Sequence, residues 1–475
     1  MSISTDRDHI RTRGGQVLPT TIQDYNAARG EVFEPRTLKA VCYAPFLSMD
    51  FDATGAVRLC NHSHSEVATL TKDASVLEIW RGAVYRKYRE DFADYVLDEK
   101  NCPHCVRQCA AGAGSHVFAT EQFDASADDD PAPAYPKRLI FRLHNLCNLA
   151  CLMCDGQTSS RIRIERDKLP NPPSRYGAQF FRDMEEMLPH VEHVEFYGGE
   201  PFLVEDHVKI FDMLRRLGAE CTIYVNTNGV SVTKRAREWL EALNFKTIAV
   251  SMDAVSDELH GEIRYGLRNS KFLQNMAYFL DLRERRGVDV MLNVTEHRKN
   301  WFELPEVFRF AEERKLYLHI NTCIHPHNVT LYTLPQDQLR YVLAYFEAQR
   351  SRLLSDYPEF SNLTNFDFLI SLVRSELESR GPEWEPTIHN RNQATDGWLA
   401  APRPGIAPFA DPNTVRAEAQ RIVTALDGGI AARMLDEMAR RTAALDDSDG
   451  WGTVHSELIA LRNELPQFDA ADGYQ

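Results

Sequence analysis

Three cysteines stand close together in the segment CNLACLMC, at Cys147, Cys151 and Cys154. They are too few to close a four-cysteine metal site and one too many for a single disulfide. Three thiolates from one short loop can hold three corners of a cubane iron–sulfur cluster, which leaves the fourth iron free to bind another molecule. The segment therefore predicts a reactive iron–sulfur centre.

The remaining cysteines fall into two kinds. Cys221 and Cys323 stand alone in or at the end of apolar runs, which is typical of buried small hydrophobes. The others gather in the N-terminal part of the chain, at Cys42, Cys60, Cys102, Cys105 and Cys109. The ten cysteines are therefore not spread evenly along the chain.

Composition and charge exclude several classes of partner. The chain has 475 residues and a formal net charge of −15, which argues against a surface that neutralises nucleic-acid phosphates or anionic lipid. Its N-terminus has no apolar core for a signal peptide, and no apolar run approaches the roughly 20 residues of a membrane-spanning helix. We therefore expect a cytoplasmic protein whose cysteines are thiols or metal ligands rather than disulfides.

Apolar strands and amphipathic helices alternate from residue 137 onward. Strands are expected at 138–144, 191–197, 221–227, 246–252, 288–294 and 316–322. Helical patterns occupy the intervals, at 180–189, 206–218, 234–244 and 304–315. This alternation predicts an α/β fold with a parallel sheet, a partial (β/α)6 barrel of the TIM type, whose ligands gather at the carboxyl ends of the strands.

Composition shifts divide the chain into five predicted parts. The barrel lies between a small N-terminal α+β cluster-binding domain and a mainly helical C-terminal extension. The predicted bounds are 1–35 for a flexible N-terminal segment, 36–120 for the cluster-binding domain, 121–136 for an acidic and Pro/Ala-rich linker, 137–325 for the barrel, and 326–475 for the extension.

A second motif follows the second expected strand. The segment GGEP, with Gly198, Gly199, Glu200 and Pro201, stands where paired glycines would let the backbone approach a ligand closely. Together with the C-x3-C-x2-C spacing after the first strand, it resembles the radical SAM superfamily. The resemblance implies that this segment receives the amino group of S-adenosylmethionine.

Two later loops extend the resemblance. Asn226 in the segment NTNG, and Ser251 and Arg264 in SMDAVSDELHGEIR, stand where the family contacts the ribose and carboxylate of the cofactor. The planar fork of an arginine can donate two parallel hydrogen bonds to a carboxylate. Taken alone, the polar residues of either segment would more simply be interpreted as a helix cap or as members of a surface ion pair.

The resemblance also implies a chemistry. A reduced 4Fe-4S cluster on the three cysteines would cleave S-adenosylmethionine to methionine and a 5'-deoxyadenosyl radical, which abstracts hydrogen from a substrate. It further implies an electron donor such as flavodoxin or ferredoxin. Hydrogen abstraction itself requires no general acid or base, and we assign no catalytic side chain.

The N-terminal cysteines are similar to the twitch or SPASM modules that hold auxiliary iron–sulfur clusters in radical SAM dehydrogenases and peptide maturases. In the better-known members the module follows the barrel, whereas here it precedes it. By this resemblance Cys42, Cys60, Cys102 and Cys105 would close one auxiliary 4Fe-4S cluster, since the spacing CPHCVRQC leaves too few cysteines for two. The same four thiols would suit a structural zinc ion equally well. His62, His64 and His104 are interpreted as solvated loop residues.

Polar residues at or beyond the expected strand ends are candidates for substrate contact. They are Tyr197, Asn293, Glu296, His297, His319 and Asn321. His319 and Asn321 alternate in one strand and so point to the same side. For any one of them alone, a satisfied polar residue at the mouth of the barrel is the simpler interpretation.

Three functions remain open at this stage. The leading expectation is oxidation or rearrangement of a small biosynthetic substrate, such as a sugar or aminocyclitol. The alternatives are maturation of a ribosomally synthesised peptide and a non-catalytic metal-binding scaffold. The intact cysteine and GGEP motifs count against the scaffold.

Overall fold

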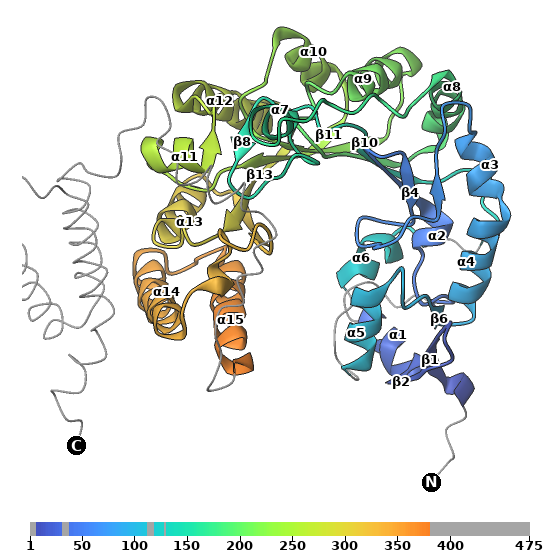
Figure 1. Cartoon of the computed structure of the whole chain (residues 1–475), viewed down its shortest axis with the longest axis horizontal. Helices are drawn as coiled ribbons and strands as arrows, with labels where there is room; N and C mark the ends of the chain where they lie inside the picture. Colours follow the sequence, from blue (N-terminus) through green and yellow to red (C-terminus); the bar gives the residue numbers. More distant parts are fainter. Residues whose placement is uncertain (1–5, 31–37, 112–117, 128–129, 381–475) are drawn as a thin grey trace, which may run out of the picture. The chain divides into compact units, whose positions relative to one another are not determined.

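The parallel strands of the barrel region pair in the order in which the sequence predicts them. A computed structural model describes residues 6–30, 38–111, 118–127 and 130–380 (Figure 1). These residues belong to two compact units. The first unit comprises Met1–Ala150, Asp155–Ser251 and Gly266–Val290, and the second comprises Cys151–Cys154, Met252–Tyr265 and Met291–Gln475.

The larger sheet of the first unit has the strand order β11-β10-β9-β7-β3-β4-β5. The strands from β11 to β3 are all parallel to their neighbours, and β4 and β5 are antiparallel. The bounds are β3 Ser48–Asp52, β4 Ala56–Arg58, β5 Ala68–Thr69, β7 Arg138–Arg142, β9 His193–Phe196, β10 Thr222–Thr227 and β11 Phe245–Ser251. The predicted α/β class with a parallel sheet is therefore confirmed.

One face of this sheet is apolar and lies under helices. Alternate residues of each strand, such as Phe196 of β9 and Val225 of β10, are fully buried. The ring of Phe211 from helix α9 (Glu205–Leu217) packs against Phe196, with ring centroids 4.2 Å apart, and against Trp239 of helix α10 (Lys234–Ala242). Figure 1 shows α9 and α10 on this side of the sheet. Burial of this face holds the strands in one register, because a one-residue slip would turn every apolar side chain to the other face.

The N-terminal hairpin belongs to the same sheet as the barrel strands. Strand β3 pairs in parallel with β7, from Ser48 opposite Arg138 to Asp52 opposite Arg142. The turn to β4 contains Gly55 with a φ of +86°, a conformation that favours glycine. The predicted cluster-binding region at 36–120 is thus joined to the barrel strands through backbone pairing.

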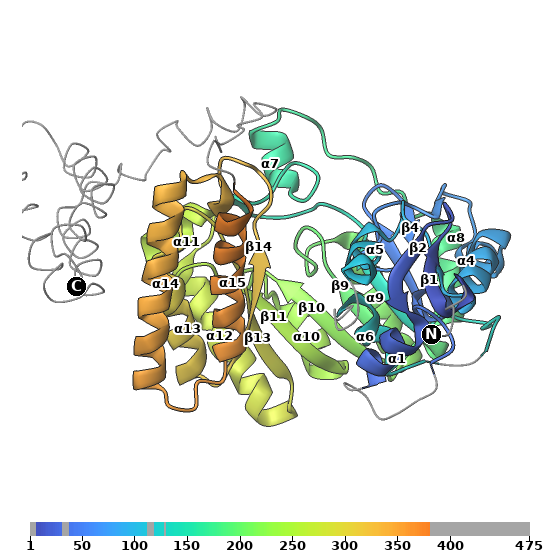
Figure 2. The same cartoon turned by 90° about the horizontal axis from the view of Figure 1, so that it is seen from below.

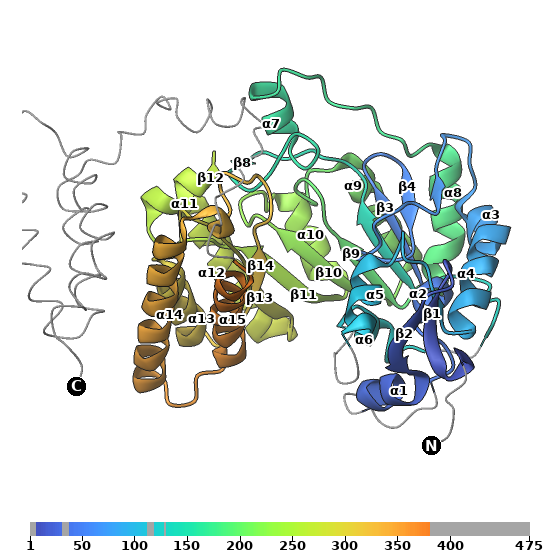
Figure 3. The same ribbon diagram turned by 60° about the horizontal axis from the view of Figure 1, so that its bottom comes forward.

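Residues 6–30 differ from the flexible segment predicted over 1–35. They form η1 (Asp6–Asp8), β1 (His9–Thr12), β2 (Val17–Thr21) and α1 (Ile22–Gly30). Strand β1 pairs with β2 and with β6 (Val96–Leu97), and Ile10 and Leu18 are fully buried. The polar composition misled the prediction because only alternate residues of such short strands need to be apolar. Figure 3 shows α1 and α5 (Pro103–Ala110) beside these strands.

The linker predicted over 121–136 also begins with ordered structure. Helix α6 (Phe118–Asp124) extends into it, and Asp124 forms a buried ion pair with Arg29 at 2.6 Å. At least one acidic residue of this stretch, Asp124, is therefore a buried ion-pair partner of the N-terminal region. The other helical elements of the first unit are α2 (Ala44–Leu47), α3 (Val76–Arg81), α4 (Ala83–Ala93), α5 (Pro103–Ala110), α7 (Ser160–Glu165), α8 (Ala178–Met187), η2 (Leu188–His190) and α12 (Asn269–Arg286).

The second unit contains the last two predicted strands and the helices that follow. Strand β13 (Asp289–Glu296) pairs in parallel with β14 (Tyr317–Thr322). Helices α14 (Gln336–Asp356) and α15 (Leu363–Ser379) lie side by side (Figure 2). The ring of Phe366 in α15 packs against that of Phe308 in α13 (Leu304–Glu313), with ring centroids 4.8 Å apart. The remaining bounds are β8 Ala150–Cys151, α11 Asp257–Ile263, β12 Arg264–Tyr265, α13 Leu304–Glu313, η3 Leu331–Thr333, α14 Gln336–Asp356 and α15 Leu363–Ser379.

The C-terminal extension is helical over its described part, as predicted for the start of 326–475. The rest of the predicted extension, from residue 381, lies outside the described residues. Within the described residues, none of the helices combines the length and the apolar character needed to cross a membrane.

Candidate active site

The loop that carries Cys147 is shaped by two serines of the following helix. The backbone N–H of Cys147 donates to Ser160 Oγ at 3.0 Å, and Ser160 Oγ donates back to the carbonyl of Cys147. Ser159 caps the N-terminus of α7 and also donates to the carbonyl of Leu149 at 2.6 Å. Because both serines are buried, these hydrogen bonds fix the backbone around the first cysteine.

The GGEP segment lies directly against this loop. Gly198 and Gly199 have φ angles of +73° and +49°. A Cβ added to Gly199 would stand 2.2 Å from the carbonyl oxygen of Leu146. The backbone N–H of Glu200 donates to the same oxygen at 2.8 Å. The structure thus brings together the two motifs that are 44 residues or more apart in the sequence, and only glycine fits at their junction.

Glu200 connects the GGEP segment to the end of strand β10. Its side chain is completely buried, and its two carboxylate oxygens accept hydrogen bonds from Thr227 Oγ1 and from the backbone N–H of Asn228, each at 2.8 Å. A buried carboxylate requires such donors, because desolvation penalises its charge. Glu200 therefore acts on the site by positioning the NTNG segment.

Asn228 is a site residue that the sequence reasoning missed. Its Nδ2 donates to Asn148 Oδ1 at 2.9 Å and lies 4.0 Å from the Sγ of Cys147. Ser231 Oγ also donates to Asn148 Oδ1. The signal was present, since NTNG contains two asparagines of which only Asn226 was selected.

Asn226 and Ser251 occupy neighbouring strands and contact each other. Ser251 Oγ donates to Asn226 Oδ1 at 3.3 Å. Both side chains are half-buried and lie at the carboxyl ends of β10 and β11. The predicted pair is thus assembled, while its contact with the ribose or carboxylate of the cofactor stays a prediction.

Arg264 is surrounded by groups that hold its charge. In the second unit its Nε lies 2.7 Å from Asp253 Oδ2, and its Nη1 is 3.8 Å from the Sγ of Cys151. Burial alone would lower the pKa of Arg264. The negative charges of Asp253 and of the Cys151 and Cys154 thiolates raise it by more, so the pKa lies above its ordinary value. Asp253, which the sequence reasoning did not select, fixes the guanidinium by an ion pair and accepts from the backbone of Thr295.

Five of the predicted substrate residues lie in the second unit and differ in exposure. Glu296 and His297 are completely buried, whereas His319 is exposed. Tyr332 and the backbone N–H of Cys323 donate to Glu296, and burial nevertheless raises its pKa to about 8. Burial lowers the pKa of His297 to about 3. These two residues are therefore neutral parts of the interior near pH 7.

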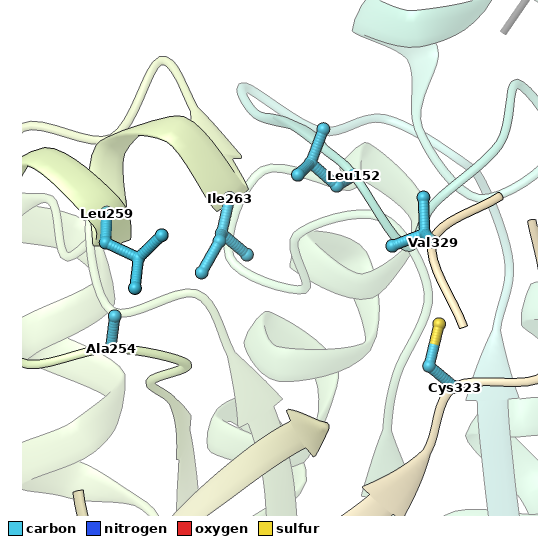
Figure 4. Close-up of a cluster of buried hydrophobic side chains, with 6 residues drawn as sticks. All are labelled: Leu152, Ala254, Leu259, Ile263, Cys323 and Val329. Carbon is cyan, nitrogen blue, oxygen red and sulfur yellow. The ribbon is translucent and has the colours of Figure 1, made fainter. Parts of the chain in front are cut away.

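The other two second-unit candidates, Asn293 and Asn321, contact each other, and Cys323 lies in an apolar setting as predicted. Asn321 Nδ2 donates to Asn293 Oδ1 across the paired strands. Cys323 is 3% exposed. It belongs to the cluster of buried side chains drawn in Figure 4, with Leu152, Ala254, Leu259, Ile263 and Val329. This cluster holds the Cys151–Cys154 segment against α11, since the backbone N–H of Leu152 also donates to the carbonyl of Ile263.

The face of the first-unit sheet opposite its helices is polar. Strand register places Asp50, Arg142, Glu195, Tyr197, Tyr224 and Asn226 on this face. Arg142 pairs with Asp50 and Arg138 pairs with Glu195. Burial raises the pKa of Asp50 to about 6, against the lowering effect of Arg142. This face offers charged and hydrogen-bonding groups next to Asn226 and Ser251.

Tyr197, the remaining substrate candidate, lies on this polar face. Its hydroxyl donates to Glu195 Oε2 at 2.7 Å, and its ring packs at 5.3 Å from that of Tyr224. The tyrosine pair therefore provides an aromatic surface among ion pairs. Such a combination suits a polar ligand with some carbon surface.

The four N-terminal thiols predicted as ligands influence one another electrostatically. Burial is the largest cause that raises the pKa of each, and each of the six pairs among Cys42, Cys60, Cys102 and Cys105 adds a further raising interaction. Cys109 interacts in this way with Cys105, and its own pKa is raised by burial. The choice of Cys42, Cys60, Cys102 and Cys105 as the ligand set stays a prediction.

The donor sets fit the groups that the sequence implies. Thiolates are preferred ligands of iron–sulfur clusters. Cys147, Cys151 and Cys154 all belong to one segment of eight residues, 147–154. Among the described residues, no three His, Cys, Asp or Glu side chains are already arranged to hold a metal ion. The backbone around Gly199 leaves no room for a side chain, as expected where a ligand approaches the backbone closely.

Comparison with known families defines the class of this region. Residues 142–308 match the Radical SAM superfamily. The matched stretch contains the three cysteines of CNLACLMC, the GGEP and NTNG segments, Ser251 and Arg264. The chain therefore carries a radical SAM domain, and the cofactors of that family are a 4Fe-4S cluster and S-adenosylmethionine.

Three known proteins show the range of its similarities. The AdoMet-dependent heme synthase of Oleidesulfovibrio alaskensis is 25% identical over 42% of this chain and 48% of its own. The PqqA peptide cyclase of Gluconobacter oxydans is 28% identical over 38% of this chain and 47% of its own. The crystal structure of Streptococcus suis SuiB bound to S-adenosylmethionine has a TM-score of 0.33 and 18% identity, over 47% of this chain and 48% of SuiB. The chain thus spans about half the length of the curated relatives it matches.

Proposed function

We propose that this chain is an enzyme that reductively cleaves S-adenosylmethionine and abstracts a hydrogen atom from a biosynthetic substrate. The observation that supports it most is the junction of three motifs around Cys147. Leu146, next to Cys147, accepts from the Glu200 backbone, Glu200 accepts from Asn228, and Asn228 contacts Cys147. The 4Fe-4S cluster, when bound, supplies the electron that cleaves S-adenosylmethionine.

The residues of the chain then bind and orient the cofactor. Gly198 and Gly199 provide a close backbone approach, which suits the amino group of S-adenosylmethionine. Arg264 keeps its charge through Asp253, and a fixed guanidinium suits the carboxylate. Asn226 and Ser251 present hydroxyl and amide groups for the ribose.

The test is formation of 5'-deoxyadenosine by the anaerobically reconstituted protein with a reductant. The triple variant Cys147→Ala, Cys151→Ala, Cys154→Ala should form none. The matched control is Cys221→Ala, which removes a buried thiol far along the sequence and should leave the rate unchanged. A triple variant that cleaves S-adenosylmethionine at the wild-type rate would remove these cysteines from the active site. Absence of cleavage in the wild type would support a metal-binding scaffold.

The substrate has two candidate classes. The polar face with Arg142, Asp50 and the Tyr197–Tyr224 pair supports a small polar molecule such as a sugar or aminocyclitol. The similarity to a PqqA peptide cyclase supports a ribosomally synthesised peptide at least as well. The test compares a pool of polar metabolites with a precursor peptide encoded beside the gene. The true class should raise 5'-deoxyadenosine formation above the rate without substrate and give a product of altered mass.

We further propose that Cys42, Cys60, Cys102 and Cys105 bind one auxiliary 4Fe-4S cluster. Their mutual electrostatic interactions support it, since like groups gathered in a buried site need a cation to offset their charge. Reconstituted protein should then contain about eight iron and eight sulfide, and Cys102→Ala with Cys105→Ala should contain about four of each. Stoichiometric zinc beside about four iron would assign the site to a structural zinc ion instead.

A further inference from the structure

A basic cavity lies beside the cysteine loop in the first unit. Its volume is about 810 Å³, and its walls include Asn148, Val230, Gly266, Arg268 and Lys271. An adjoining cavity of about 510 Å³ shares Val230 and Lys271 and adds Lys234 and Arg237. Below, the basic surface means Lys234, Arg237, Arg268 and Lys271 around these two cavities.

The basic surface carries charge that the described residues do not neutralise. Neither cavity is lined by an aspartate or glutamate. Within the described part of the chain, none of its four cations forms an ion pair with a carboxylate. Lys271 Nζ instead donates to the amide of Gln274 at 3.1 Å, and Arg237 lies 4.4 Å above the ring of Tyr278.

Other cations on the same two helices do have carboxylate partners. Arg235 of α10 pairs with Asp212, and Arg285 of α12 pairs with Glu241 at 2.8 Å. Helices α10 and α12 also begin at these cavities, and the N-terminal ends of helices carry partial positive charge. On a protein with a formal net charge of −15, such a local excess of positive charge favours an anionic partner.

Short contacts connect the basic surface to the first cysteine. Asn148 lines the larger cavity, and Asn228 bridges Asn148 Oδ1 and the Sγ of Cys147. Arg161 Nη1 donates to the carbonyl of Asn148 at 3.1 Å, and Gly266, also a lining residue, packs against Arg161. The cavity therefore opens beside the loop that holds Cys147.

We propose that the basic surface is the docking site for an acidic electron-carrier protein that reduces the cluster held by Cys147, Cys151 and Cys154. This inference rests on the proposed function. Lys234 and Arg268 are exposed, so their charges face an approaching protein rather than close around a small anion. The carrier loses one electron and the cluster gains it, while no proton or group is transferred. Opposite charge on the carrier would steer the encounter and set its orientation.

The test combines binding with two ways of supplying electrons. The double variant Arg268→Glu, Lys271→Glu reverses two charges of the basic surface, and glutamate in the first turn of α12 is compatible with the helix dipole. Binding of oxidised flavodoxin to the reconstituted protein, measured at low salt, should weaken about tenfold or more, the scale of electrostatic steering. The rate of 5'-deoxyadenosine formation with reduced flavodoxin should fall in parallel, whereas the rate with dithionite should stay at the wild-type value.

The control has the same change of charge elsewhere in the first unit. Arg86→Glu with Arg182→Glu alters two exposed arginines, on α4 and α8, that have no carboxylate partner among the described residues. It should bind flavodoxin as the wild type does. Equal weakening in both double variants would overturn the proposal in favour of a general charge effect. Unchanged binding and flavodoxin-driven rate in the Arg268, Lys271 variant would also overturn it.

Two other results separate this proposal from its alternatives. Inactivity of the wild type with dithionite would contradict the proposed function, whereas loss of the flavodoxin-driven rate alone concerns only the docking site. If inorganic phosphate at a low concentration protected Lys271 from acetylation while flavodoxin did not, the surface would be a small-anion site and the docking proposal would be wrong.

Discussion

Replacement of Glu200 by alanine should loosen the junction between the GGEP segment, the NTNG segment and the cysteine loop. The carboxylate is completely buried and accepts from Thr227 Oγ1 and the Asn228 N–H, each at 2.8 Å. Alanine leaves both donors buried without their acceptor. Because Asn228 also contacts Asn148 and Cys147, the loss should reach the first cysteine.

The expected cost follows from these two hydrogen bonds. A hydrogen bond to a charged group contributes about 1.5–3 kcal/mol, so the free energy of unfolding should fall by about 3–6 kcal/mol. Glu200→Gln keeps one oxygen but turns an N–H₂ group toward one of the donors, so its cost should be about 1–3 kcal/mol. Urea denaturation of the reconstituted protein measures these differences. Equilibrium binding of S-adenosylmethionine should weaken in the same order, alanine more than glutamine.

The matched control is Glu205→Ala. Glu205 lies in the first turn of α9, is exposed, and has no side-chain partner among the described residues. Its replacement should change the free energy of unfolding by about 0.5 kcal/mol or less. If Glu200→Ala and Glu205→Ala were equally stable and bound S-adenosylmethionine equally well, Glu200 would not position the NTNG segment.

Three further changes test other parts of the structure. Gly199→Ala should destabilise more than Gly218→Ala, because both glycines have positive φ but only a Cβ at Gly199 meets backbone atoms, 2.2 Å from the Leu146 oxygen; equal losses in urea denaturation would exclude the clash. Glu296→Gln should gain stability relative to wild type from about pH 5 to pH 8. Burial raises the pKa of Glu296 from 4.5 to about 8, so the folded wild type keeps a proton that the unfolded chain has lost, and its stability falls over this range by up to about 5 kcal/mol. A constant difference between the two proteins at both pH values would refute it. Cys102→Ala with Cys105→Ala should leave S-adenosylmethionine cleavage intact while product formation fails, as measured by the ratio of product to 5'-deoxyadenosine.

The sequence is informative where local pattern decides structure. The expected strands that became β7, β9, β10, β11, β13 and β14 were found from their apolar runs, because burial of one sheet face requires such residues. The motif segments could also be placed at the carboxyl ends of these strands. That placement predicts that both segments lie at the same edge of the sheet, and there the Glu200 N–H donates to the Leu146 oxygen.

Other parts depend on contacts between distant residues and could not be predicted. Nothing in the local sequence shows that Glu200 accepts hydrogen bonds from Thr227 and Asn228. Nor does it show that Asp253 forms an ion pair with Arg264. The pairing of β3 with β7 joins residues about 90 apart, and an exposed edge of either strand could equally have been covered by another element. The strands β1 and β2, of four and five residues, are too short for their alternation of apolar and polar residues to be recognised within the segment 1–35 that the composition predicts as flexible.

The pairing of β3 with β7 bears directly on what the auxiliary thiols can do. Cys42 precedes β3, and Cys60 follows β4, which runs back so that Arg58 lies opposite Asp50. Both cysteines are therefore near the amino end of β3, whereas Cys147 follows the carboxyl end of the parallel neighbour β7. Strands of this length span on the order of 15 Å.

This separation decides how the Cys102, Cys105 variant should be interpreted. Since Cys102 and Cys105 interact electrostatically with Cys42 and Cys60, we expect the four thiols to lie about one strand length from Cys147 along the strand direction. A fall in product with unchanged 5'-deoxyadenosine would then support a redox role of this site after hydrogen abstraction. Product at the wild-type ratio, in a variant with lower resistance to urea, would instead show that the site only holds the N-terminal region against β7.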